Sequence, residues 1–158
     1  MSIFEKYSNH INADELKASQ KEIQDNANGD YPEIPVGKYE VKVDKMECKK
    51  AKTSGNLMVS VWFKILKGTY ANSIIFYNGV FHKDYPRHNT AKFLSDLLDD
   101  GDRTAEINLI LKSNNMATIN DFCMDIHEDI DGRLEYLLDY GKKGEFNTYT
   151  IEEVFDAE

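Results

Sequence analysis

The chain has 158 residues, of which 41% are hydrophobic and 11% aromatic, and its formal net charge is −9. This length suits one domain with a hydrophobic core, and the composition is typical of a folded protein rather than a disordered one. With no apolar run of about 18 residues and no basic, apolar N-terminus, we expect neither a membrane span nor an export signal. Cys48 and Cys123 have no zinc or redox spacing, so we expect a reducing, intracellular compartment.

The charge is distributed unevenly along the chain. Residues 38–67 contain eight lysines and three acidic residues, a local charge of +5. Residues 95–158 contain seventeen acidic and five basic residues, a local charge of −12. The negative total argues against a nucleic-acid ligand, but the clustered lysines are compatible with one phosphate-binding face.

Residues 1–37 are predicted to form an N-terminal arm. Asn12 and Glu15 have the spacing of a capping box, which would begin a short helix over about 13–25. The turn-forming stretch NANGDYPEIPVG would end this helix and lead into the first strand.

From residue 38 the pattern changes to the alternation of β-strands. Apolar side chains recur at every second position in 38–46 and along one row of 55–66, and the basic segment 49–55 connects these two strands. A glycine-centred turn leads into a third strand at 73–78. In the second strand, one row would face the core: Leu57, Val59, Val61, Phe63 and Ile65. Trp62 and Lys64 belong to the other row.

A helical insert is expected over about 89–130. Asn89 or Thr90 would cap a helix that ends at Asp100–Gly101, residues 104–111 fit either helix or strand, and residues 116–130 favour another helix. The strand pattern returns at 132–141 and 144–155, followed by an acidic tip at 156–158. The order β-β-β-α-β-β is that of the OB fold. We therefore predict a mainly β domain over 38–155, an OB-like five-stranded barrel with a helical insert.

Trp62 and Lys64 belong to the row that should face solvent, where a tryptophan needs an explanation. One interpretation is that Trp62 packs under the N-terminal arm or against another subunit. The other is a stacking platform for single-stranded nucleic acid, with aromatic rings under the bases and lysines along the backbone. The predicted binding residues are Trp62, Lys64, Lys42, Lys49, Lys50, Lys52, and Phe76 or Tyr77, whichever faces outward.

Two further segments allow two interpretations each. The loop at 81–89 would either close over a bound strand or tuck its aromatic residues against the barrel. The C-terminal segment would either finish the last strand or recruit other proteins through Phe155, Glu152, Glu153 and Asp156.

We find no catalytic motif and predict no enzyme, no metal site and no cofactor. His82 and His88 lack further zinc ligands at a suitable spacing. Asp99, Asp100 and Asp102 could hold Mg²⁺ in a nuclease, but such an acidic helix end is usually only a polar terminus. The other rival is an acidic module that binds a host or replication protein through residues 95–158 and does not bind nucleic acid.

Several motifs stand out in residues 34–76. They are Pro-x-Gly-x-Tyr at 35–39, Lys-Thr-Ser-Gly at 52–55 and Phe-Lys-Ile-Leu-x-Gly-x-Tyr at 63–70. Together with the closing GEFNTYTIEEVFD, this region resembles a family of bacteriophage and prophage proteins that was long catalogued as a domain of unknown function and is associated with phage single-stranded-DNA-binding proteins. The resemblance implies an OB-like protein of the bacterial cytoplasm that coats single-stranded DNA during phage replication or recombination, without sequence preference. For such a coating protein we also expect self-association.

Overall fold

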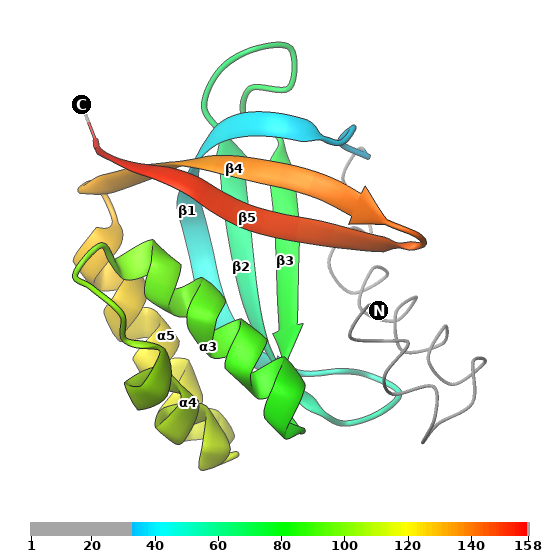
Figure 1. Ribbon diagram of the computed structural model, residues 1–158, viewed down its shortest axis with the longest axis vertical. Coiled ribbons are helices and arrows are strands. Elements are labelled where there is room, and N and C mark those ends of the chain that lie inside the picture. The colour runs from blue at the N-terminus through cyan, green and yellow to red at the C-terminus, as the bar shows by residue number, and fades with distance from the viewer. Residues whose placement is uncertain (1–32, 158) are drawn as a thin grey trace.

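A computed structural model of the protein describes residues 33–157, which form five strands and three helices (Figure 1). The strands are β1 (Gly37–Lys50), β2 (Leu57–Ile65), β3 (Ile74–Val80), β4 (Leu134–Lys143) and β5 (Phe146–Asp156). The helices are α3 (Asp84–Leu98), α4 (Thr104–Lys112) and α5 (Met116–Ile130). The predicted helix at 13–25, with nearly all of the predicted arm, lies outside the described residues.

The strands form one antiparallel sheet in the order β3-β2-β1-β4-β5. The first part of β1, Gly37–Val41, pairs with β4, and the part from Val41 to Lys50 pairs with β2. A β-bulge lies between Val43 and Lys45, where a bulge bends its strand. As a result β4 and β5 cross in front of β1–β3, and β1 belongs to both layers (Figure 1).

The sheet is open and does not close into a barrel, whereas the five predicted strands and the helical insert between β3 and β4 are confirmed. β3 and β5 are the two edges of the sheet. They are linked by a side chain, since the Tyr149 hydroxyl donates to the Phe76 carbonyl over 2.8 Å. The Tyr77 ring lies 5.2 Å from the Tyr149 ring. These rings keep the two edges apart, because a strand ladder needs a spacing of about 4.8 Å.

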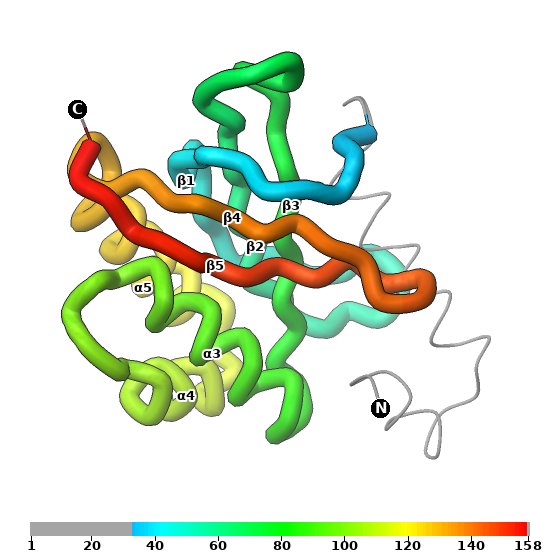
Figure 2. Tube along the Cα trace, turned by 45° about the horizontal axis from the view of Figure 1, so that its top comes forward, coloured from blue at the N-terminus to red at the C-terminus, as the bar shows by residue number. Residues whose placement is uncertain are grey.

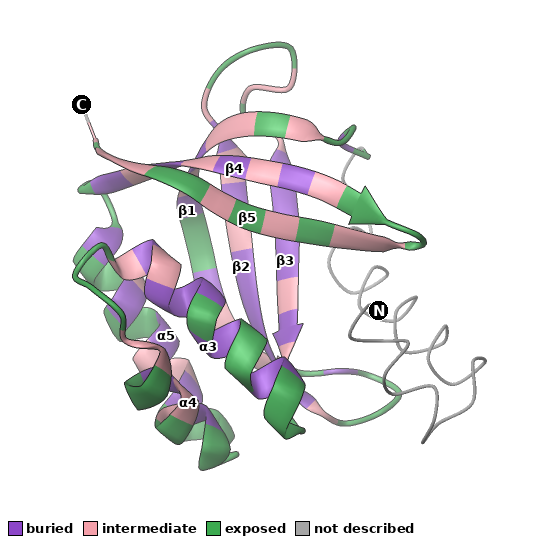
Figure 3. Cartoon of the chain, viewed as in Figure 1, coloured by how far each residue is buried: buried purple, intermediate pink, exposed green. Residues whose placement is uncertain are grey.

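The hydrophobic core lies between the inner face of β1–β3, the strand β4 and the three helices. The predicted inner row of β2 is confirmed, since Val59, Val61, Phe63 and Ile65 are completely buried. Figure 3 shows β2 and β3 as largely buried, with exposed residues gathered on the helix surfaces and at the tip of the β4–β5 hairpin. No helix of the described residues is long and apolar enough to cross a membrane.

The helical insert is longer than predicted. Helix α3 begins at Asp84 rather than at Asn89 or Thr90, because Pro86 is tolerated in a first turn, where its missing N–H costs no hydrogen bond. The ambiguous segment at 104–111 is helical. Helix α5 is confirmed at 116–130, and the Asn115 side chain caps it by accepting from the Thr118 N–H over 3.0 Å. Figure 2 shows the three helices gathered on one side of the sheet.

Candidate nucleic-acid interface

The side of β1–β3 that faces away from the main core, called the outer face below, brings most of the predicted binding residues together. Trp62 lies opposite Phe76 in the β2–β3 register, and their rings meet edge to face at 5.1 Å. Phe76 is 6% exposed and Trp62 is half-buried. Tyr77 belongs to the main core instead. Phe76, not Tyr77, therefore shares the outer face with Trp62 and supports its indole ring.

The predicted lysines follow this face along β1 and β2. Lys42 lies directly opposite Lys64, and Lys49 lies opposite Met58. Lys50 ends β1, and Lys52 lies in the exposed connection to β2. Lys42, Lys49 and Lys64 thus line the same side of the sheet as Trp62. Lys50 lies opposite Leu57 of the core row and lines a pocket with the start of α5, so it does not belong to the outer face.

The structure adds Lys45, which the sequence analysis missed. Its register partner is Trp62, and its Nζ lies 4.8 Å from the centroid of the indole ring, within the range of a cation–π contact. Strict alternation would place Lys45 on the inner row with Val43. The bulge turns Lys45 to the outer face. The sequence shows the same change of register, because the apolar positions of β1 are 41, 43, 46 and 48 and do not keep a period of two.

The predicted lysines form no ion pair with an acidic residue within residues 33–157. This holds for Lys42, Lys49, Lys50, Lys52 and Lys64, whereas Lys45 pairs with Glu47 at 3.5 Å. Burial lowers the pKa of Lys49; Glu47 raises that pKa, while Lys45 and Lys52 lower it further. The face therefore holds positive charges that repel one another, and a bound anion would relieve this repulsion.

The predicted protein-binding residues are part of the sheet. Phe155, Glu153 and Asp156 are paired with β4, and Glu152 forms an ion pair with Lys38 at 3.0 Å. Strand β5 continues through Asp156, so it takes in the first residue of the predicted acidic tip. Their role in binding another protein stays a prediction.

The predicted nine-residue loop at 81–89 does not exist as a loop, because α3 begins at Asp84. Phe81 is 2% exposed and belongs to the main core. Arg87 is 8% exposed and pairs with Asp84 at 2.7 Å. Phe81 therefore packs in the main core as one interpretation predicted, whereas Tyr85 is 43% exposed. Closure of this segment over a bound strand stays a prediction.

The acidic residues after α3 take part in local structure. Asp100 pairs with Arg103 at 3.0 Å, and Asp102 accepts from the Thr104 N–H over 2.9 Å. Hydrogen bonds from Thr104 lower the pKa of Asp102. Residues 33–157 contain no group of three or more His, Cys, Asp or Glu side chains placed to hold a metal ion.

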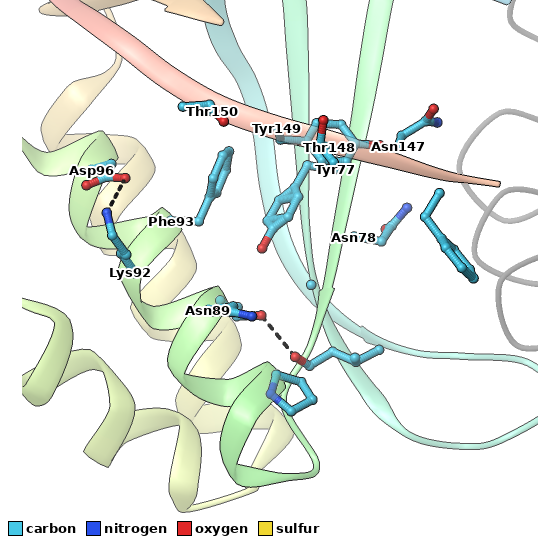
Figure 4. Close-up of a pocket in the computed structure, with 15 residues that line it drawn as sticks. Tyr77, Asn78, Asn89, Lys92, Phe93, Asp96, Asn147, Thr148, Tyr149 and Thr150 are labelled. Carbon is cyan, nitrogen blue, oxygen red and sulfur yellow. Dashed lines mark hydrogen bonds and ion pairs between the residues drawn. The ribbon is translucent and has the colours of Figure 1, made fainter. Parts of the chain in front are cut away.

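A cleft of about 530 Å³ lies where the sheet is open, between the end of β3, the start of β5 and the helix α3 (Figure 4). Tyr77 and Phe93 project into this space from β3 and α3, with ring centroids 4.1 Å apart. Gly79 permits this arrangement, because a Cβ at that position would lie 2.6 Å from the Tyr77 hydroxyl oxygen and 2.7 Å from the Thr90 Oγ1. The cleft could not be predicted from the sequence, since its walls come from three distant segments.

The tyrosines in the cleft wall predict a loss of stability at alkaline pH. Burial raises the pKa of Tyr77 to about 12, and it also raises the pKa of Tyr149. Because an unfolded tyrosine ionises near about pH 10, the unfolded state loses its proton first, so this contribution is present below about pH 10 and is lost as the pH rises to about 12. Urea unfolding at increasing pH should show the midpoint falling in this window, and less steeply in Tyr77→Phe. A midpoint that stays level would contradict the burial of these hydroxyls.

A family model described as a protein of unknown function (DUF669) matches residues 12–93, just over half of the chain. No curated protein and no solved structure matches the chain. The matched region includes β1, β2, β3 and the first part of α3, and therefore the whole outer face. The description of the family states no activity, so phage origin and DNA binding stay predictions.

Proposed function

This chain belongs to the DUF669 family of proteins of unknown function, and we propose from the residues on its outer face that it binds single-stranded DNA without sequence preference. The binding site is the outer face. Trp62, supported by Phe76, stacks on a base, and the lysines of β1, β2 and their connection bind the phosphates. The setting is phage DNA replication or recombination, in which several subunits coat one strand.

The observation that carries this proposal is the combination of an aromatic pair with unpaired lysines on one sheet face. Trp62 and Phe76 are in contact, and Lys42, Lys49 and Lys64 occupy the same side of the neighbouring strands. Single-stranded nucleic acid is bound by such a combination, because every base has a face that stacks and every phosphate attracts a cation. A protein partner would require no such periodic spacing of lysines around an indole.

The topology supports the same proposal. An OB fold is a partly open five-stranded barrel that binds oligonucleotides with the face of strands 2 and 3 and with the loops joining strands 1–2 and 4–5. Here the β1–β2 connection carries Lys52, and the β4–β5 hairpin carries Lys142 and Lys143 at its tip. We therefore propose an OB-like domain whose basic loops flank the outer face.

The fluorescence of Trp62, the only tryptophan in the chain, tests the proposal directly. Oligo-dT added at about 50 mM salt should quench it to saturation, and the affinity should fall at about 200 mM salt because releasing the same counterions into more concentrated salt gains less entropy. Inorganic polyphosphate is the matched control, since it carries the charge without bases and should not quench by stacking. An unchanged spectrum and no retained oligonucleotide at low salt would favour the acidic interaction module instead.

A further inference from the structure

We infer that the cleft between β3, β5 and α3 binds a nucleobase of the strand held on the outer face. This inference rests on the proposed function and assigns a second, chemically different part of the same site. The cleft volume of about 530 Å³ lies within the range of about 300–1,000 Å³ that is usual for small-ligand pockets. It is therefore large enough for a base with its sugar.

The side chains of the cleft suit a neutral, planar and polar group. Phe93, Tyr77 and Tyr149 supply aromatic walls, and Asn89 and Asn147 reach the cleft from α3 and β5. A carboxamide offers both a donor and an acceptor, which matches the edge of a base. Asn78 also borders the cleft, but it follows Tyr77 in β3, so its side chain shares the Phe76 side of the strand.

The charge of the cleft argues against a phosphate as its ligand. Its lysine, Lys92, is already paired with Asp96 at 3.4 Å, at the end of the cleft away from Asn78 and Asn147 (Figure 4). The two charges compensate each other, so the cleft has no excess positive charge to attract a phosphate. Lys42, Lys49 and Lys64, which form no ion pair within residues 33–157, lie on the outer face instead, which separates the sites for backbone and base.

The edge of β3 argues against an added peptide strand. Its Phe76 carbonyl accepts from Tyr149, and its Val80 carbonyl accepts from the Thr90 hydroxyl over 2.9 Å. Strand addition requires a free row of backbone groups along an edge. Because two alternate carbonyls of β3 are already occupied by side chains, this edge offers too few partners for a sixth strand.

The cleft continues directly from the outer face. The Phe76 ring supports Trp62 on that face, while the Phe76 carbonyl points toward β5 at the cleft. Asn78, two residues further along β3, lines the cleft. A strand that stacks one base on Trp62 and crosses β3 would therefore bring a neighbouring base to the opening between Asn78 and Asn147.

The test uses the full chain, oligo-dT, and an oligonucleotide of equal length whose sugars carry no bases. We expect Asn89→Ala/Asn147→Ala to lower the affinity for oligo-dT roughly 10-fold, because two amide contacts to a base are lost. Its affinity for the abasic strand should equal that of the wild type. Glu128→Ala, an exposed position on α5, is the control and should change neither affinity.

A second readout locates the base. Oligo-dT carrying 5-iodo-deoxyuridine is irradiated on the wild-type protein, and the crosslinked peptide is identified by mass spectrometry. A crosslink to Tyr149, Tyr77 or Phe93 supports the inference. Crosslinks at Trp62 alone, or an equal loss of both affinities in the double variant, overturn it while leaving the proposed function intact. If the wild-type protein binds no oligonucleotide, the inference about the cleft and the proposed function are both overturned.

Discussion

Replacing Lys42 and Lys64 together by glutamine should lower the affinity for oligo-dT about 25-fold at about 0.1 M salt. The two lysines are register partners on the outer face and form no ion pair within residues 33–157. Each phosphate contact to a single strand contributes about 0.7 to the slope of log affinity against log salt concentration. Losing two contacts should therefore lower this slope by about 1.4, which gives the expected loss of affinity.

The same variant should not lose stability. Like charges directly opposite each other across two strands destabilise a sheet, by roughly 0.2–1 kcal/mol for a pair of this kind. Removing both lysines should therefore leave the free energy of unfolding unchanged or raise it slightly. Reduced binding with undiminished stability would separate a binding role from a structural one.

A matched control removes the same charge elsewhere. Lys83 precedes α3 and Lys112 ends α4, both exposed in the helical part of the protein. Lys83→Gln/Lys112→Gln should keep nearly the wild-type affinity and salt slope, measured by fluorescence titration under the same conditions. Equal losses of affinity in the two double variants would mean that only the net charge of the protein matters. The outer face would then no longer be the proposed binding site.

Replacing Tyr136 by alanine should lower the free energy of unfolding by about 3–5 kcal/mol, the range for removing a large buried aromatic side chain. Tyr136 lies in β4, is completely buried and belongs to the main core. Its hydroxyl donates to the Leu97 carbonyl over 2.7 Å, in the last turn of α3. The side chain therefore joins the layer of β4 and β5 to the helical insert.

Two further variants separate the contribution of the Tyr136 hydroxyl from that of its ring and provide a control. Tyr136→Phe keeps the ring but leaves the buried Leu97 carbonyl without its donor, which should cost about 1–3 kcal/mol. Tyr85→Ala removes a tyrosine that is 43% exposed on α3 and should change the stability by no more than about 0.5 kcal/mol. Urea unfolding followed by circular dichroism measures all three. If Tyr136→Phe were as damaging as the alanine variant, the packing of the ring would contribute little.

The net charge of −9 does not oppose the proposed function, because the charges are separated in space. Lys42, Lys49 and Lys64 lie on the outer face of β1–β3, whereas the helices on the other side of the sheet carry many of the acidic residues. At physiological salt, charges further apart than about 8 Å are largely screened from each other. A strand on the outer face would therefore respond mainly to the lysines beside it.

The sequence by itself determined the strands, the core row of β2 and the helix α5, because these depend on local periodicity that burial on one face imposes. It also placed Trp62 and Lys64 on the row away from the core. It could not choose between Phe76 and Tyr77, since that choice depends on the pairing of β2 with β3. The outward position of Lys45 could not be predicted without the bulge in β1. The start of α3 could not be predicted without knowing that Phe81 and Arg87 are buried.

The open sheet and its cleft were decided only by the tertiary structure. Residues 77–80, 86–96 and 146–150 carry no shared pattern, and they meet because β1 bends and brings β5 across β3. Whether the edges then pair depends on the side chains between them, here Tyr149, Tyr77 and Phe93. Local periodicity records which face of a strand is buried, but the distance between two remote edges is set by the volume of the side chains packed between them.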